Sequence, residues 1–184
     1  MRSLITGGLF ATLVVGSAVA SGIQIEVEGE ANGTVTIDLL EDIAPQHAER
    51  ITKLAADGKY DGVVFHRVID GFMAQTGDVK HGKMGGDMRR AGTGGSDMPN
   101  LAAEFSDVNY EKGVVGMARA QSPDSANSQF FIMFNDAPFL NGQYTVVGRV
   151  TDGQDVVDAI KRGTGGNGAV IGQPDMMKTV TVID

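Results

Sequence analysis

The feature that most constrains the fold is a series of short apolar segments separated by glycine-containing turns. Residues 23–28 alternate apolar and polar side chains, as a half-buried strand does. Residues 34–40 repeat the alternation after an Asn32-Gly33 turn, which predicts a hairpin. Six further strands are predicted, at 63–69, 72–77, 113–119, 129–134, 145–150 and 178–183.

Two predicted helices interrupt these strands. The first begins at Pro45, which suits a first helical position, and stops at Gly58. Its apolar residues recur at helical spacing: Ala48, Ile51, Leu54 and Ala55. The second is predicted over 154–162, with Gly163 just past its end. Together these elements predict a mainly β protein, a closed eight-stranded antiparallel β-barrel capped by two α-helices, since closure removes exposed sheet edges.

The first twenty residues differ from the rest. Arg2 is followed by a short apolar run over 9–15 and by Ala18-Val19-Ala20, the small-residue pattern of a signal-peptidase site. A transmembrane anchor is the alternative, but the run is short for a bilayer and is flanked by Gly and Ser residues. We therefore predict a signal peptide over 1–20, cleavage after Ala20, and one domain over 21–184 without stable membrane association.

Composition excludes several classes of function. The chain has no cysteine, which removes disulfides, thiolate metal sites and cysteine nucleophiles. Its formal net charge of −8 argues against nucleic-acid binding. The three histidines, His47, His66 and His81, lack metal-ligand spacing, so no metal or other cofactor is predicted. We interpret His66 as a hydrogen-bonded structural residue, and take a monomer as the default.

Two glycine-rich runs imitate nucleotide-binding motifs. Residues 77–83 fit most of a phosphate-binding loop, but Met84 stands where Ser or Thr would bind magnesium. Residues 163–168 fit G-x-G-x-x-G, yet they follow a predicted helix and precede a predicted strand, the reverse of a dinucleotide fold. Both are interpreted as loops.

Two other segments carry chemistry. Residues 65–78 read Phe-His-Arg-Val-Ile-Asp-Gly-Phe-Met-Ala-Gln-Thr-Gly-Asp, which places a cation, an amide and large apolar groups around an Asp-Gly turn. Residues 116–119 (Gly-Met-Ala-Arg) and 125–132 (Ser-Ala-Asn-Ser-Gln-Phe-Phe-Ile) add aromatic surface and a second amide. On residue types alone, a plain barrel wall with a lone surface arginine remains an alternative.

These segments closely resemble the cyclophilin family of peptidyl-prolyl isomerases. The family pattern F-H-R-x-I-x-G-F-M-x-Q-x-G-D is met throughout 65–78, and M-A-R followed by S-Q-F-F-I is similar to the bacterial branch. The resemblance covers essentially the whole chain after residue 20. It implies an eight-stranded barrel with two helices, an active site on the outer face, and proline-containing unfolded or partly folded polypeptides as partners. With the export signal, it predicts a periplasmic protein.

Carried over by position, the resemblance implies that Arg67 is catalytic and that Gln75 orients it. It implies substrate contacts at Phe72, Met73, Gly92, Met117, Ala118, Arg119, Gln129, Phe131, Phe139, Leu140 and Tyr144. A two-residue Asp70-Gly71 turn would set Arg67 level with Ala74 and leave Gln75 on the other face, so the orienting role requires a bulge or another register.

The chain departs from the family pattern in the substrate region. Phe139 stands where many members have Trp, and Tyr144 where many have His. The Trp position is associated in the family with cyclosporin binding through its indole N–H, which Phe lacks. The resemblance therefore implies weak inhibition by cyclosporin.

Residues 79–91 form a longer loop than in compact members, and it carries four cations, Lys80, Lys83, Arg89 and Arg90. This loop either shapes the approach of substrates to Gly92 or is a solvated surface loop. A non-catalytic proline-peptide binding module, or a holdase chaperone, is the alternative to an isomerase. No motif supports a hydrolase or metalloenzyme.

Overall fold

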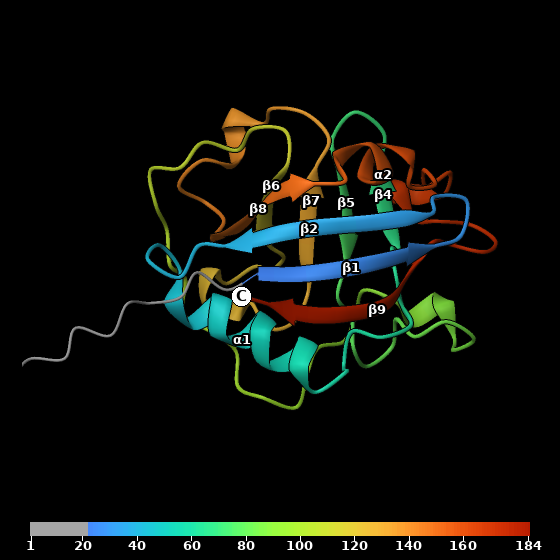
Figure 1. Ribbon diagram of the computed structural model, residues 1–184, viewed down its shortest axis with the longest axis horizontal. Helices are drawn as coiled ribbons and strands as arrows, with labels where there is room; N and C mark the ends of the chain where they lie inside the picture. Colours follow the sequence, from blue (N-terminus) through green and yellow to red (C-terminus); the bar gives the residue numbers. More distant parts are fainter. Residues whose placement is uncertain (1–21) are drawn as a thin grey trace, which may run out of the picture.

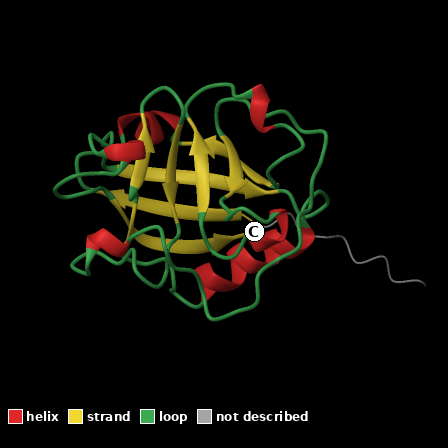
Figure 2. Cartoon of the chain, turned by 180° about the vertical axis from the view of Figure 1, so that it is seen from behind, coloured by secondary structure: helices red, strands yellow, loops and turns green. Residues whose placement is uncertain are grey.

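The structure, a computed structural model, describes residues 22–184, so the predicted signal peptide lies outside the described residues. A single antiparallel sheet curls over on itself, so that β9, β1 and β2 cross β7, β5 and β4 at a steep angle (Figure 1). The reverse view shows the same two layers with the order of depth exchanged (Figure 2).

The described part of the chain has nine strands: β1 (Gly22–Glu28), β2 (Gly33–Leu39), β3 (Val63–Val64), β4 (Arg67–Ile69), β5 (Met73–Thr76), β6 (Val114–Met117), β7 (Phe130–Met133), β8 (Val146–Asp152) and β9 (Met176–Ile183). Their order in the sheet is β3-β9-β1-β2-β8-β6-β7-β5-β4. The prediction of a mainly β, antiparallel fold is confirmed.

The predicted strand over 63–69 is bent at Phe65 and His66, and its two halves form the two edges of the sheet. β3 pairs with β9, whereas β4 pairs with β5. Only two residues, Phe65 and His66, therefore connect the two edges of the sheet. If 63–69 is counted as one strand, the sheet has the eight strands that were predicted. Counted by hydrogen-bonded pairing it has nine, because the two halves of this bent strand pair with different neighbours.

Two α-helices pack against the sheet, α1 (Pro45–Ala56) and α2 (Gln154–Ala159). All four apolar residues predicted to face inward from α1 are buried. α2 is shorter than the predicted 154–162, because Ile160 leaves the helical conformation (ψ 132°) and its side chain, 1% exposed, enters the core. Within residues 22–184, no helix is long and apolar enough to cross a membrane.

Residues 22–184 also contain four short 3₁₀ turns, at Met88–Arg90 (η1), Pro123–Ser125 (η2), Pro138–Leu140 (η3) and Gly166–Gly168 (η4). η4 falls in the G-x-G-x-x-G run, and the other glycine-rich run, 77–83, is irregular apart from a one-residue bridge at Lys83. Both are loops, as predicted.

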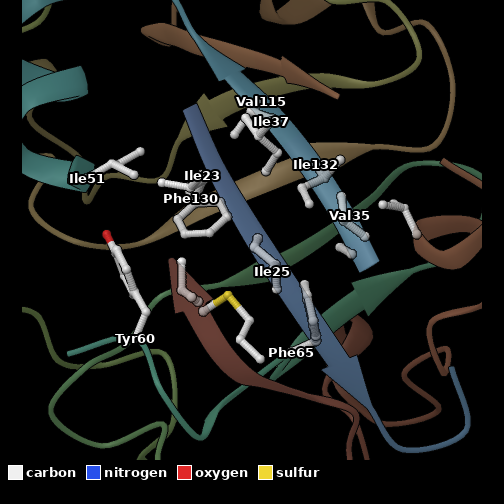
Figure 3. Close-up of a cluster of buried hydrophobic side chains, with 14 of the residues drawn as sticks. Ile23, Ile25, Val35, Ile37, Ile51, Tyr60, Phe65, Val115, Phe130 and Ile132 are labelled. Carbon is white, nitrogen blue, oxygen red and sulfur yellow. The ribbon is translucent and has the colours of Figure 1, made fainter. Parts of the chain in front are cut away.

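The strands present two apolar faces. The inner face holds the main core, in which Ile25, Ile37, Phe130 and Ile132 converge inside the curl (Figure 3). A second cluster lies on the outer face: Met73, Tyr110, Val114, Phe131, Met133, Ala137, Leu140 and Val146. Because side chains alternate along a strand, β5 and β7 contribute to both clusters, and the outer cluster supplies an apolar floor outside the barrel.

Candidate active site

The hairpin of β4 and β5 places Arg67 and Gln75 directly opposite each other. Three residues, Asp70-Gly71-Phe72, connect the two strands, and Gly71 adopts a positive φ of 69°. This loop is one residue longer than the turn considered from sequence, which shifts the register and puts both side chains on one face. Arg67 Nη1 donates to Gln75 Oε1 at 3.1 Å.

A chain of side-chain amides fixes the orientation of Gln75. Its Nε2 donates to Gln129 Oε1 at 3.0 Å, and Gln129 Nε2 donates to the carbonyls of Gly92 (3.0 Å) and Gly94 (2.7 Å). Each amide has its donor end engaged, so the oxygen of Gln75 must face Arg67. The predicted residues Arg67, Gln75, Gln129 and Gly92 thus form one hydrogen-bonded row.

The carboxylate of Asp78 anchors the far end of this row. Asp78 is fully buried and accepts hydrogen bonds from the backbone N–H groups of Lys80, His81, Gly92 and Gly94. Burial alone raises the pKa of Asp78, but the four N–H donors outweigh it and leave the pKa below its usual value. Asp78 therefore remains ionised and fixes the segment that carries Gly92.

An apolar cleft of about 390 Å³ opens beside Arg67 on the outer face. It is lined by Arg67, Phe72, Met73, Gln75, Ala118, Arg119, Phe131, Phe139, Leu140, Gln143 and Tyr144. Phe72 and Phe139 pack at its rim, with ring centroids 5.5 Å apart, and Phe131 meets Tyr144 edge to face at 5.9 Å. The cleft therefore unites most of the substrate-contact residues inferred from the resemblance.

A second, more polar cleft of about 380 Å³ adjoins the first and shares Gln75, Ala118 and Arg119 with it. Gly92 and Gln129 line this second cleft. The Arg119 guanidinium lies 4.4 Å from the centroid of the Tyr144 ring and donates to the carbonyl of Gln143 at 3.0 Å. Arg119 thereby separates the two clefts.

Met117 is a correction to the inferred set. Its side chain is 1% exposed and packs in the core inside the curl, not in either cleft. Val115 and Met117 share the inner face of β6, because residues two apart on a strand point the same way. Ala118, the next residue, is the one that reaches the clefts.

His66 packs as a buried residue, which agrees with the structural part of its predicted role. Both ring nitrogens are buried, and neither makes a hydrogen bond of normal geometry to a described residue. The ring packs on Gly92, where a Cβ atom would lie 2.9 Å from His66 Cδ2. Burial is the main influence on this ring and lowers its pKa, so the ring is neutral near pH 7.

The cationic loop is attached to the rest of the protein through Lys83, whose Nζ donates to the carbonyl of Lys59 at 2.7 Å. Its other three cations, Lys80, Arg89 and Arg90, are exposed, and Arg89 pairs with Asp87 at 2.8 Å within its own turn. In the part of the chain that the structure describes, no three histidine or acidic side chains cluster as a metal site would require.

Sequence reasoning missed one partner of Arg67. Asn167, in η4, accepts from Arg67 Nε through its carbonyl and from Nη2 through Oδ1, both at 3.0 Å. An asparagine before glycine in a glycine-rich run was the available signal, because such residues adopt left-handed conformations. Partial burial lowers the pKa of Arg67, although a guanidinium stays protonated at any physiological pH.

Fold and site define a curled β-barrel of the cyclophilin class. The family model described as "Cyclophilin type peptidyl-prolyl cis-trans isomerase/CLD" matches residues 23–182. A "Probable peptidyl-prolyl cis-trans isomerase" of Brucella suis is 50% identical over 189 residues, covering 99% of this chain and 96% of the relative. The protein of the same description from Brucella melitensis matches equally well.

Solved structures agree on the fold. A cyclophilin-type isomerase of Cryptosporidium parvum superposes with a TM-score of 0.74 at 24% identity, covering 90% of this chain and 98% of that one. Cyclophilin AquaCyp293 of Hirschia baltica gives a TM-score of 0.68 at 26% identity, covering 87% and 73%. The chain belongs to the cyclophilin-type peptidyl-prolyl cis-trans isomerase family and is an isomerase of X–Pro bonds.

Proposed function

We propose that the protein isomerises X–Pro bonds without covalent chemistry, by holding the proline ring in the apolar cleft while Arg67 assists the twist of the amide. The arrangement of the cleft carries this proposal: a guanidinium lies at the edge of a pocket floored by Met73, Phe131 and Leu140. A proline ring can bind in this cleft. The Cryptosporidium parvum relative was crystallised in the presence of the dipeptide Ala-Pro.

The chemistry follows from the amide itself. Rotation about an X–Pro bond has a barrier of about 20 kcal/mol, because twisting breaks the resonance of the amide. In the twisted state the prolyl nitrogen regains a basic lone pair, to which Arg67 donates a hydrogen bond. That bond is absent in the planar ground state, so it lowers the barrier selectively. Stabilisation by about 5 kcal/mol accelerates the step several thousand-fold.

The polar cleft would hold the backbone on the other side of the bond. Its lining is rich in polar groups, including Ser96, Asn100 and Asn127, while the apolar cleft fixes the ring. One side of the amide is thus immobilised by packing and the other by hydrogen bonds, which orients the peptide relative to Arg67.

We further propose that the substrates are unfolded or partly folded proteins in the periplasm, and that the enzyme acts as a monomer. The first twenty residues and their small-residue cleavage pattern support export. Fractionation of cells, with the N-terminus of the purified protein determined by mass spectrometry, tests this part: an N-terminus at Ser21 in the periplasmic fraction is the expected result.

The activity test compares the protein with Arg67→Ala and Arg67→Lys in a short X–Pro peptide, with exchange rates measured by NMR. We expect Arg67→Ala to lose about 100-fold or more of kcat/KM, and Lys to recover little of it. Full activity in Arg67→Ala would contradict the proposed mechanism. Binding of the peptide without acceleration by the unmutated protein would instead favour a holdase or binding module.

A further inference from the structure

The loop over 163–170 contains the G-x-G-x-x-G run that the sequence analysis interpreted as a loop. It is hydrogen-bonded to the strand that carries Arg67. The N–H of Gly163 donates to the carbonyl of Val68 at 2.8 Å, and the N–H of Val170 donates to the carbonyl of His66 at 3.0 Å. These bonds flank Arg67 on both sides. The loop is therefore held in a fixed position over Arg67.

Glycine at position 168 is what permits this approach. Gly168 has a φ of 77°, and a Cβ atom there would lie 2.4 Å from Ile69 Cγ1. The turn is closed by a hydrogen bond from Gly165 N–H to the carbonyl of Ala169 at 2.9 Å. Asn167 lies in this turn, between Gly165 and Ala169, whose backbone groups are hydrogen-bonded to each other.

Asn167 is the only non-glycine residue with positive φ in the stretch that the structure describes (φ 55°, ψ 29°). Asparagine tolerates this left-handed region better than most residues. The conformation turns two acceptors of one residue towards one guanidinium: the carbonyl to Arg67 Nε and Oδ1 to Nη2, each at 3.0 Å. Such paired contacts fix orientation as well as distance.

The donors of Arg67 can be counted. A guanidinium has five N–H groups. One on Nε and one on Nη2 go to Asn167, and one on Nη1 goes to Gln75. One N–H is left on each terminal nitrogen; Nη1 also lies 3.9 Å from Met73 Sδ, at the cleft floor. The two partners thus engage both edges of the group and leave donors for the cleft.

We propose that Asn167 is a positioning residue for isomerisation: with Gln75 it holds the Arg67 guanidinium in the single orientation that presents its remaining N–H groups to the prolyl nitrogen. This inference rests on the proposed role of Arg67. Without Asn167, Arg67 would have to be ordered again in each catalytic cycle, so the loss falls on kcat and not on peptide binding.

The sharpest variant is Asn167→Gly. Glycine adopts positive φ freely and keeps the carbonyl acceptor, so only the Oδ1 bond is removed. Among residues 22–184, the hydrogen bonds of the Asn167 side chain go to Arg67 alone, so the turn itself does not depend on them. Asn32→Gly is the matched control, since Asn32 lies in an exposed turn and bonds only to Gly29 and Glu30.

We expect Asn167→Gly to lower kcat about three- to tenfold, as for one lost hydrogen bond, with KM changed less than twofold. Asn167→Asp keeps an acceptor at the same atom and is expected to recover kcat. In an Arg67→Ala background, Asn167→Gly should cause no further loss, because it acts through Arg67. An unchanged kcat, or an equal loss in that background, would overturn the proposal.

A direct readout does not depend on the variants folding. The Nε–H resonance of Arg67 in the unmutated protein should be observable by NMR, protected from exchange and shifted from that of a free side chain. It should persist in Asn167→Gly, which keeps the carbonyl. A resonance like that of a free arginine would overturn the proposal at the contact itself. Full activity of Arg67→Ala with a protected resonance would overturn the catalytic role of Arg67, and with it the role of Asn167 in isomerisation, while leaving the contact between the two residues in place.

Discussion

At the scale of single residues, Phe139 is the most exposed apolar side chain of the apolar cleft. Its ring is 64% exposed and touches Phe72, whereas Leu140, its neighbour in η3, is 7% exposed and contributes to the cleft floor. A ring in this position covers a bound ligand from above. It supplies apolar area but has no donor for a ligand carbonyl.

Phe139→Trp is predicted to increase inhibition by cyclosporin. The indole adds the N–H donor that the resemblance associates with this ligand, and one new hydrogen bond corresponds to about a five- to tenfold lower inhibition constant. Titration of isomerase activity with cyclosporin in both proteins measures it. Equal inhibition constants would show that the ring at this position does not decide sensitivity.

Much of the site was predicted from residues 65–78, 116–119 and 125–132, because these segments match the cyclophilin pattern position by position. The register of Arg67 and Gln75 was not, since it depends on one extra loop residue that composition does not reveal. Met117 was placed wrongly because a motif does not say which of its residues point inward. Asn167 was missed because its role arises from a contact across 100 residues of chain.

At the scale of elements, the start of α1 lacks the usual side-chain cap. Ala44 precedes the helix and offers no acceptor. Glu104, 57 residues away from His47 in sequence, supplies the missing cap. Its carboxylate accepts from the N–H groups of Gln46 (3.2 Å) and His47 (3.2 Å), and from His47 Nδ1 at 2.5 Å. The carboxylate also faces the positive end of the helix dipole.

Glu104→Ala is predicted to lower the free energy of unfolding by about 1–2 kcal/mol, the usual loss for a helix cap. Urea unfolding measures it, with Glu49→Ala as control, because Glu49 is exposed on the same helix. A loss no larger than that of the control would mean that α1 begins without help from Glu104.

Elements themselves were largely predictable, because glycine turns and apolar alternation mark them. All eight predicted strands exist, and the ends that differ do so for tertiary reasons. The strand over 63–69 bends so that β3 and β4 can pair with different partners. The periodicity correctly pointed Ile160 inward, but it did not show that Ile160 leaves the helical conformation there and ends α2 early.

At the scale of the whole molecule, the free energy of unfolding at acid pH should depend on Asp78. This residue bonds to the backbone of Gly92 and Gly94, which line the polar cleft. The pKa of Asp78 is lower in the folded protein than its ordinary value of 3.8. The ionised carboxylate therefore stabilises the fold above that ordinary pKa, and this contribution is lost as the pH falls through the lower folded pKa.

Asp78→Asn is predicted to cost about 2 kcal/mol of unfolding free energy at pH 7, since an amide cannot accept as strongly from four N–H donors. The difference from the unmutated protein should shrink as the pH falls below 3.8 and through the lower pKa of the folded protein. Urea unfolding at several pH values tests this, with Asp97→Asn, an exposed site, as control. A difference independent of pH would contradict the argument.

The pairing of β1 with β9 also determines when the protein can fold. Gly22 lies opposite Ile183, so the first and last described strands are neighbours, and β3 likewise waits for β9. Without β9, β1 pairs with β2 alone and β3 has no strand partner. The curl therefore closes only when β9 docks, and loosening of this one strand would release both of its neighbours together.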